Sequence, residues 1–223
     1  VNYVTARMEL IMSRDSRITQ SGAFTQADLK KLETDYALAI EEIGMNQVTA
    51  PIIGSYAHLK AFYLDKIDEA IVLLEEIITI PRISPQFVAQ NKLVLGDILV
   101  LKGEVWEASL LYSQVDKDYK NDAIGREAKY KNARLSYFMG EFEWAAAQLN
   151  VLKSATSQLI SNDAMQLSLL IMDNLGFDSI TDPLMMYSRA DLFEFCNRHD
   201  QSFATLDSLL TQYPGHSLTD EAL

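Results

Sequence analysis

The chain of 223 residues carries a net charge of −12, from 19 Lys and Arg against 31 Asp and Glu. Such a charge repels phosphate backbones and anionic membrane surfaces, which argues against nucleic acid as a partner. Hydrophobic residues make up 48% of the sequence, with only 9 Gly and 5 Pro, and this composition excludes a disordered chain and a many-stranded β protein. We therefore expect an all-α protein.

The sequence shows no signal for membrane insertion. No stretch approaches the roughly 18 consecutive apolar residues of a membrane-spanning helix, and charges such as Arg7 and Asp15 interrupt a signal-peptide pattern. The chain begins at Val1 without an initiator Met and ends at Leu223 inside an expected helix. We therefore expect a fragment of a longer protein, without its export signal. The lone Cys196 excludes an intramolecular disulfide and leaves the redox compartment open.

Apolar residues recur with helical periodicity along the whole chain. In chain order, the expected helices span residues 3–13, 26–43, 50–64, 66–79, 85–101, 104–116, 122–139, 142–154, 161–174, 183–197, 200–212 and 217 onward. The expected breaks fall at Gly22, Gly44, Pro81 with Pro85, Gly103, Gly140, Gly176 and Pro214. Short loops between amphipathic helices make consecutive helices antiparallel neighbours, so the pattern predicts an array of helical hairpins.

One hairpin motif recurs, with a small residue in its second helix. That residue is Ala70, Ala108, Ala145 or Ser202 in the four copies. The first and second lie 38 residues apart, and the second and third lie 37 residues apart. The first helices carry a small residue at Gly96, Ala133 and Ala190, and a large apolar residue follows the second-helix position at Leu74, Tyr112, Leu149 and Leu206. Small residues let helix backbones approach closely, and the large residue one turn on fills the space between hairpins.

These positions, with Pro81 and Pro214 after the second helices, resemble the tetratricopeptide repeat. The resemblance implies a right-handed α-α superhelix of antiparallel helical hairpins. It is incomplete, because Lys92, Leu99, Lys129 and Ser136 stand at the aromatic positions of the first helices. The closing run 213–217 resembles bacterial envelope tetratricopeptide proteins, and the whole chain resembles repeat proteins of Bacteroidetes without an assigned activity. We therefore expect the bacterial periplasm or envelope rather than the cytoplasm.

The repeat is interrupted after its third copy. The 57 residues between Ala145 and Ser202 are too many for one repeat and too few for two, and they hold an extra helix at 161–174. Its apolar positions Met165, Leu169 and Met172 fit a helix packed on the array. We predict a degenerate leading repeat at 1–48, three hairpins at 49–153, the inserted helix within 154–182, and a fourth hairpin with a truncated next repeat at 183–223.

Several patterns that mimic chemical sites have simpler explanations. Residues 116–127 hold acids at calcium-loop spacing, but Lys120 and Asn121 stand where a ligand and a glycine are needed. Cys196 lies three residues before His199, yet a free cysteine is commonly buried as a small hydrophobe. The histidines His58, His199 and His216 lie in separate repeats. With no phosphate loop, nucleophile motif or dinucleotide fingerprint either, we predict no enzyme, no cofactor and no metal.

The resemblance implies that the first helix of each repeat lines a concave binding surface. The residues that it places there are Asp97, Tyr130, Arg134, Tyr137, Tyr187, Asp191 and Glu194. Tyrosines with a few charges suit recognition, although the same tyrosines equally fit packing between helices. We predict a non-catalytic interaction or assembly scaffold that binds a protein or peptide segment, with the oligomeric state open. The alternative is an envelope protein that binds a small molecule or glycan, in a pocket made partly by the helix at 161–174.

Overall fold

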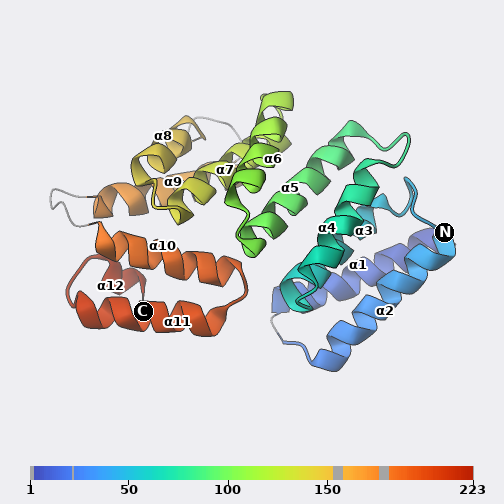
Figure 1. Cartoon of the computed structure of the whole chain (residues 1–223), viewed down its shortest axis with the longest axis horizontal. Helices are drawn as coiled ribbons and strands as arrows, with labels where there is room; N and C mark the ends of the chain where they lie inside the picture. The colour runs from blue at the N-terminus through green and yellow to red at the C-terminus, as the bar shows by residue number, and fades with distance from the viewer. Residues whose placement is uncertain (1–2, 22, 153–157, 176–180, 223) are drawn as a thin grey trace. The chain divides into compact units, whose positions relative to one another are not determined.

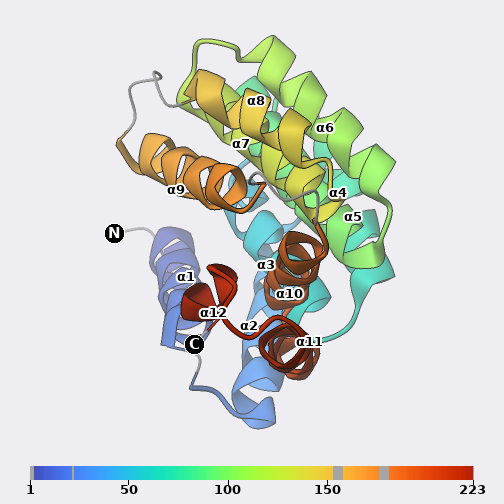
Figure 2. The same ribbon diagram turned by 90° about the vertical axis from the view of Figure 1, so that its left-hand side faces the viewer.

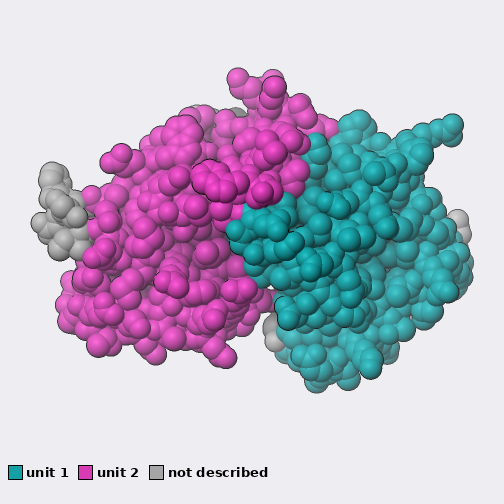
Figure 3. All heavy atoms as spheres, viewed as in Figure 1, with its two compact units in different colours: residues 1–104 teal, residues 105–223 magenta. Residues whose placement is uncertain are grey.

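The computed structural model describes residues 3–21, 23–152, 158–175 and 181–222. These residues form helices and no strand, and 82% of them are helical, which confirms the all-α prediction. The chain divides into two compact units, residues 1–104 and 105–223 (Figure 3). This division falls inside the 49–153 region predicted to hold three hairpins. No described helix is long and apolar enough to cross a membrane.

The described residues of the first unit form five helices. They are α1 (Tyr3–Ser21), α2 (Gln26–Ile43), α3 (Ala50–Tyr63), α4 (Ile67–Ile78) and α5 (Pro85–Lys102). The Thr25 hydroxyl accepts a hydrogen bond from the Asp28 amide at 3.2 Å, and the Asp28 carboxylate accepts one from the Thr25 amide at 2.9 Å. This reciprocal cap fixes the start of α2. At the other end of the unit, Gly103 adopts a left-handed φ of 89° that ends α5.

The core of the first unit joins α1, α2 and α3. Ile11 and Ile18 of α1 pack with Leu29 and Leu32 of α2. The ring of Tyr36 stacks on that of Tyr56, with centroids 5.1 Å apart. Helix α1 runs eight residues beyond the predicted end at residue 13, because Ile18 lies two turns after Ile11 on the same buried face. The polar residues between these two isoleucines conceal that face in the sequence.

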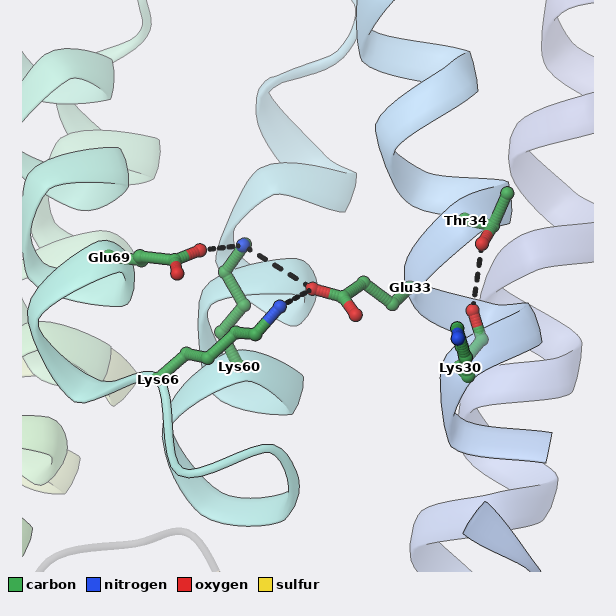
Figure 4. A network of polar contacts seen from close by, with 6 residues as sticks. All are labelled: Lys30, Glu33, Thr34, Lys60, Lys66 and Glu69. Atoms are coloured by element: carbon green, nitrogen blue, oxygen red, sulfur yellow. Dashed lines mark hydrogen bonds and ion pairs between the residues drawn. The ribbon is translucent and has the colours of Figure 1, made fainter. Parts of the chain in front are cut away.

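A buried lysine ties three helices of the first unit together (Figure 4). Lys60 of α3 bonds Glu69 of α4 through its ammonium group, which also lies 3.6 Å from the Glu33 carboxylate of α2. Lys66, just before α4, adds a 2.6 Å contact to the same Glu33 oxygen. The Lys60 ammonium also stands 4.7 Å from the ring centroid of Tyr56. Burial lowers the pKa of Lys60, but the bonds to Glu69 and Tyr56 outweigh it, so the pKa is raised and the lysine stays charged.

The second unit contains the other helices. They are α6 (Val105–Asp118), α7 (Ala123–Phe138), α8 (Phe142–Leu152), α9 (Gln158–Asn174), α10 (Asp182–Phe195), α11 (His199–Gln212) and α12 (Leu218–Glu221). Helix α7 contacts α6, α8, α9 and α10, and α10 also packs against α11 and α12. Figures 1 and 2 show α10 and α11 side by side, running in opposite directions. Gly140, with a φ of 77°, makes the tight turn between α7 and α8.

The inserted helix was predicted correctly in position but not in orientation. Helix α9 packs against α8 and α7, yet Met165, Leu169 and Met172 are 47–55% exposed, so their predicted packing is wrong. The fully buried residues are Ala164, Ser168 and Ile171. They have the same helical spacing as the three predicted residues, one position earlier, and two of them are small. A small-residue face allows closer approach than the bulky stripe would.

Most of the other expected helices agree with the structure to within about three residues at each described end. The predicted breaks at Gly22 and Gly176 lie outside the described residues. The small repeat positions Ala70, Gly96, Ala108, Ala133, Ala145, Ala190 and Ser202 are all buried, as are Leu74, Tyr112 and Leu149. Leu206 is half-buried and Pro214 is exposed.

Candidate functional site

A hollow of about 780 Å³ opens in the second unit, between α7, α9, α10 and the segment that contains α12. Its lining consists of Tyr130, Arg134, Tyr137, Asp163, Gln166, Leu167, Leu169, Leu170, Asp173, Asn174, Tyr187, Asp191, Ser217 and Glu221. Three tyrosines, four carboxylates and a single guanidinium therefore surround one space. A volume of this size is typical of ligand sites.

The structure brings together five of the seven residues that the repeat resemblance placed on a binding surface. Tyr130, Arg134, Tyr137, Tyr187 and Asp191 all line the hollow. They come from two first helices, α7 and α10, that contact each other. This arrangement is what the carried-over positions predict for neighbouring repeats.

The other two predicted residues lie elsewhere. Asp97 belongs to α5 of the first unit and is half-buried. Glu194 is exposed and contacts the Nδ1 atom of His199 at 2.8 Å, outside the lining of the hollow.

Sequence reasoning missed the polar wall that α9 contributes. Four polar residues of α9 line the hollow, namely Asp163, Gln166, Asp173 and Asn174. The second, third and fourth follow the first by 3, 10 and 11 residues. Positions three, seven and eleven residues apart share one face of a helix. The sequence therefore did carry a signal for this wall. The signal was a stripe of polar residues along one face of the helix.

One hydrogen bond joins two of the helices that line the hollow. The Tyr137 hydroxyl donates to the Asp191 carboxylate at 2.9 Å and so joins α7 to α10 across 54 residues of sequence. Tyr137 is completely buried, and burial together with the charge of Asp191 raises its pKa, so it stays a donor. Burial also raises the pKa of Asp191, although the Tyr137 bond and the charge of Arg134 act in the opposite direction. The environment thus leaves the Asp191 charge incompletely compensated.

Arg134 is engaged mainly with aromatic rings. Its guanidinium carbon lies 5.1 Å from the ring centroids of both Phe138 and Phe195, neither of which lines the hollow. The two rings are themselves 5.8 Å apart. Stacking on aromatic faces suits the planar, weakly hydrated guanidinium and holds it at the border of the hollow.

Two further tyrosines present half-buried rings to the hollow. Burial, then the charges of Asp191 and Glu221, raise the pKa of Tyr187 to about 12. Burial also raises the pKa of Tyr130, while the charge of Arg134 lowers it and the smaller effects of Asp163 and Asp191 raise it. The Tyr187 hydroxyl donates to the backbone carbonyl of Glu221 at 3.4 Å. Both phenols therefore remain protonated, and the charges that act on Tyr187 are negative.

The patterns that mimicked chemical sites have structural roles. Residues 116–118 and 123–127 are helical, and Asp116 lies 3.6 Å from Lys129. Cys196 is buried, and burial raises the pKa of its thiol. Across the residues that the structure describes, no group of three or more His, Cys, Asp or Glu side chains is placed to hold a metal ion.

The adjacent helical pairs and the small buried repeat positions define a tetratricopeptide-like fold, as predicted. Among solved structures, the chain is similar to a tetratricopeptide repeat protein from Parabacteroides merdae ATCC 43184, with a TM-score of 0.52 and 15% sequence identity. The match covers 92% of this chain and 80% of the other, and at this identity it shows the fold alone. The sequence matches no family model, and no curated protein matches it.

Proposed function

We propose that this chain is a non-catalytic scaffold that binds a segment of a partner protein in the hollow of its second unit. The observation that carries the proposal is the convergence of Tyr130, Arg134, Tyr137, Tyr187 and Asp191, expected on a binding surface from sequence, around one space of about 780 Å³. Half-buried tyrosines bury a large area on binding with little loss of side-chain entropy, which is why they dominate many interfaces.

Its walls suit the capture of a short segment rather than of a flat surface. Gln166 and Asn174 supply amides, while Leu167 and Leu170 supply apolar contact area. Sites that combine apolar walls with a few fixed polar groups orient an inserted chain and exclude water from it. Because the lining comes from several packed helices, we expect binding with little movement of the backbone.

The test requires a variant that alters the walls and preserves the core. Tyr137 is unsuitable because it is completely buried, whereas Tyr130 and Tyr187 are half-buried. The test variant is therefore Tyr130→Ala with Tyr187→Ala. The control is Phe203→Ala, which removes a 65% exposed ring from α11, outside the lining.

A displayed library of random linear peptides is selected on the whole chain, and the dissociation constants of selected peptides are measured by fluorescence polarisation. The double variant should weaken binding at least about tenfold, since truncating central aromatic residues of an interface commonly costs that much. Phe203→Ala should bind like the parent. Circular dichroism checks that both variants keep their helicity. The proposal fails if no peptide is enriched, or if the double variant binds as tightly as the parent.

A second candidate function is favoured by one observation, the contribution of α9 to the hollow. The alternative from sequence placed a small-molecule or glycan pocket at this inserted helix, and seven of its residues line the hollow. A thermal-shift screen with oligosaccharides distinguishes the two functions, because a ligand that binds only the folded state raises its melting temperature. If an oligosaccharide raises the melting temperature of the parent but not that of the Tyr130→Ala with Tyr187→Ala variant, the small-molecule function is favoured.

A further inference from the structure

We infer that the hollow recognises a basic side chain, Lys or Arg, of the partner segment, an inference that rests on the proposed function. The lining carries four carboxylates, Asp163, Asp173, Asp191 and Glu221, against one cation, Arg134. The imbalance extends to the whole second unit, where residues 105–223 contain 9 Lys and Arg against 17 Asp and Glu. A negative field of this kind steers basic segments toward the hollow and rejects acidic ones.

The described residues compensate the carboxylates of the hollow only in part, through the charge of Arg134 near Asp191. Among the described residues, none of the four forms an ion pair with a Lys or Arg side chain. The single cation of the lining, Arg134, is stacked on Phe138 and Phe195 at the border. Charges that find no partner within a fold are available to a partner outside it, and the first unit, where Lys60 is surrounded by carboxylates, shows the opposite arrangement.

The tyrosines make the negative charge selective for an organic cation. Tyr130 shares the hollow with Arg134, Asp163 and Asp191, whose charges all act on it, and Tyr187 shares it with Asp191 and Glu221. Each half-buried ring therefore stands near two carboxylates. An ammonium or guanidinium group placed over such a ring is attracted by its π face and hydrogen-bonds the adjacent carboxylates.

The spacing of the acidic groups fits a long side chain better than a metal ion. No three of them converge on one point within the described residues, and the hollow of about 780 Å³ is far larger than an ion. A Lys or Arg side chain has an apolar stem as well as a charged head. Leu167 and Leu170 provide the apolar wall for such a stem.

The test uses the peptides selected on the whole chain. We expect one position enriched in Lys or Arg, and a synthetic peptide with Gln at that position should bind about tenfold more weakly. In the protein, Asp163→Asn with Glu221→Gln should weaken binding by a similar factor and reduce its sensitivity to added NaCl. The matched control is Asp207→Asn, an exposed residue of α11 outside the lining, which should bind like the parent.

The outcomes separate this inference from the function on which it rests. Peptides without a basic preference whose binding is lost in Tyr130→Ala with Tyr187→Ala would overturn the inference and leave the proposed function standing. Equal binding by Asp163→Asn with Glu221→Gln and by the parent would also overturn it. Peptides that bind the double tyrosine variant as tightly as the parent would contradict both the inference and the proposed function.

Discussion

The two units differ in how far the charge of an inward-facing side chain is compensated. In the first unit, Lys60 is only 8% exposed, and both Glu33 and Glu69 compensate its charge. In the second unit, Asp191 has one neutral donor, Tyr137, and shares its surroundings with three further carboxylates. A compensated charge holds helices together, whereas an uncompensated one costs stability and is retained where it serves binding. The contrast therefore sets a charge network that joins three helices against the proposed binding site of the second unit.

The largest expected effect is on the compensated network. Replacing Lys60 with Met keeps an apolar stem beside Tyr56 but removes the charge that joins α2, α3 and α4. We expect the free energy of unfolding to fall by about 2 kcal/mol, below the full loss for a buried pair because Lys66 still compensates Glu33. Urea denaturation followed by circular dichroism measures it.

Lys30→Met is the matched control for this prediction. Lys30 is an exposed residue of α2, and only its backbone carbonyl takes part in the contacts drawn in Figure 4, where it accepts a bond from Thr34. Its replacement should change stability by less than about 0.5 kcal/mol. Equal losses in the two variants would mean that the Lys60 network contributes nothing specific.

In the second unit, the corresponding experiment removes the hydrogen-bond donor of the half-buried Asp191 carboxylate. Tyr137→Phe keeps the ring in the core and leaves Asp191 without its hydrogen bond. We expect a loss of about 1.5 kcal/mol, the usual cost of a buried acceptor that loses its partner. Asp191→Asn keeps an acceptor for Tyr137 and removes the charge, so its stability should equal or exceed that of the parent.

Thermal and urea unfolding of these two variants distinguish structure from recognition. A strong destabilisation by Asp191→Asn would show that the charge itself holds α7 and α10 together. The hollow would then resemble the Lys60 network, and the contrast between the units would disappear.

One residue of the first unit, Asp15, is an exception to this contrast, because its carboxylate is not compensated. Asp15 has a buried carboxylate oxygen without a hydrogen-bond partner in the described structure, and the Tyr36 hydroxyl is in the same state. Burial raises the pKa of Asp15 from 3.8 to about 6, while the nearby Tyr36 hydroxyl acts in the opposite direction. The folded state therefore binds this proton more tightly than the unfolded state, so the fold loses stability as the pH rises from 3.8 to about 6.

Asp15→Asn should consequently stabilise the chain in a pH-dependent way. We expect a gain of about 1 kcal/mol above pH 6, a value reduced for the partial exposure of the group. The gain should decline as the pH falls from 6 to 4, because the carboxyl of the parent then becomes neutral in the folded state. Urea unfolding at pH 8 and pH 4 measures it, and a gain of equal size at both pH values would contradict the burial of a charge.

The sequence predicted the helices and much of the hollow, because both depend on local periodicity and repeat phase. Four of its lining residues stand at the repeat positions that the tetratricopeptide resemblance places on a binding surface, and could therefore be named from the sequence. They are Tyr130, Arg134, Tyr187 and Asp191. The contribution of α9 was not predictable in this way, because that helix lies outside the repeat and its orientation depends on close packing against α8. The expectation of a periplasmic or envelope location also stays a prediction.

The smallest expected effect concerns the one repeat copy that departs from alanine. The hydroxyl of Ser202 donates to the Ala190 carbonyl at 2.9 Å and so links α11 to α10, whereas Ala70, Ala108 and Ala145 rely on contact alone. Ser202→Ala should lower the free energy of unfolding by about 0.5 kcal/mol, because a helical carbonyl keeps its backbone partner when a second donor is lost.

Ser208 provides the control for this last prediction. Its hydroxyl donates to the Ala204 carbonyl one turn earlier in the same helix, at 2.8 Å. A bond within one helix does not hold two helices together, and alanine has the higher helix propensity, so Ser208→Ala should be neutral or slightly stabilising. Thermal unfolding of both variants compares a bond between helices with a bond within one. Equal effects would mean that Ser202 is tolerated in the repeat only for its small size, as alanine is in the other three copies.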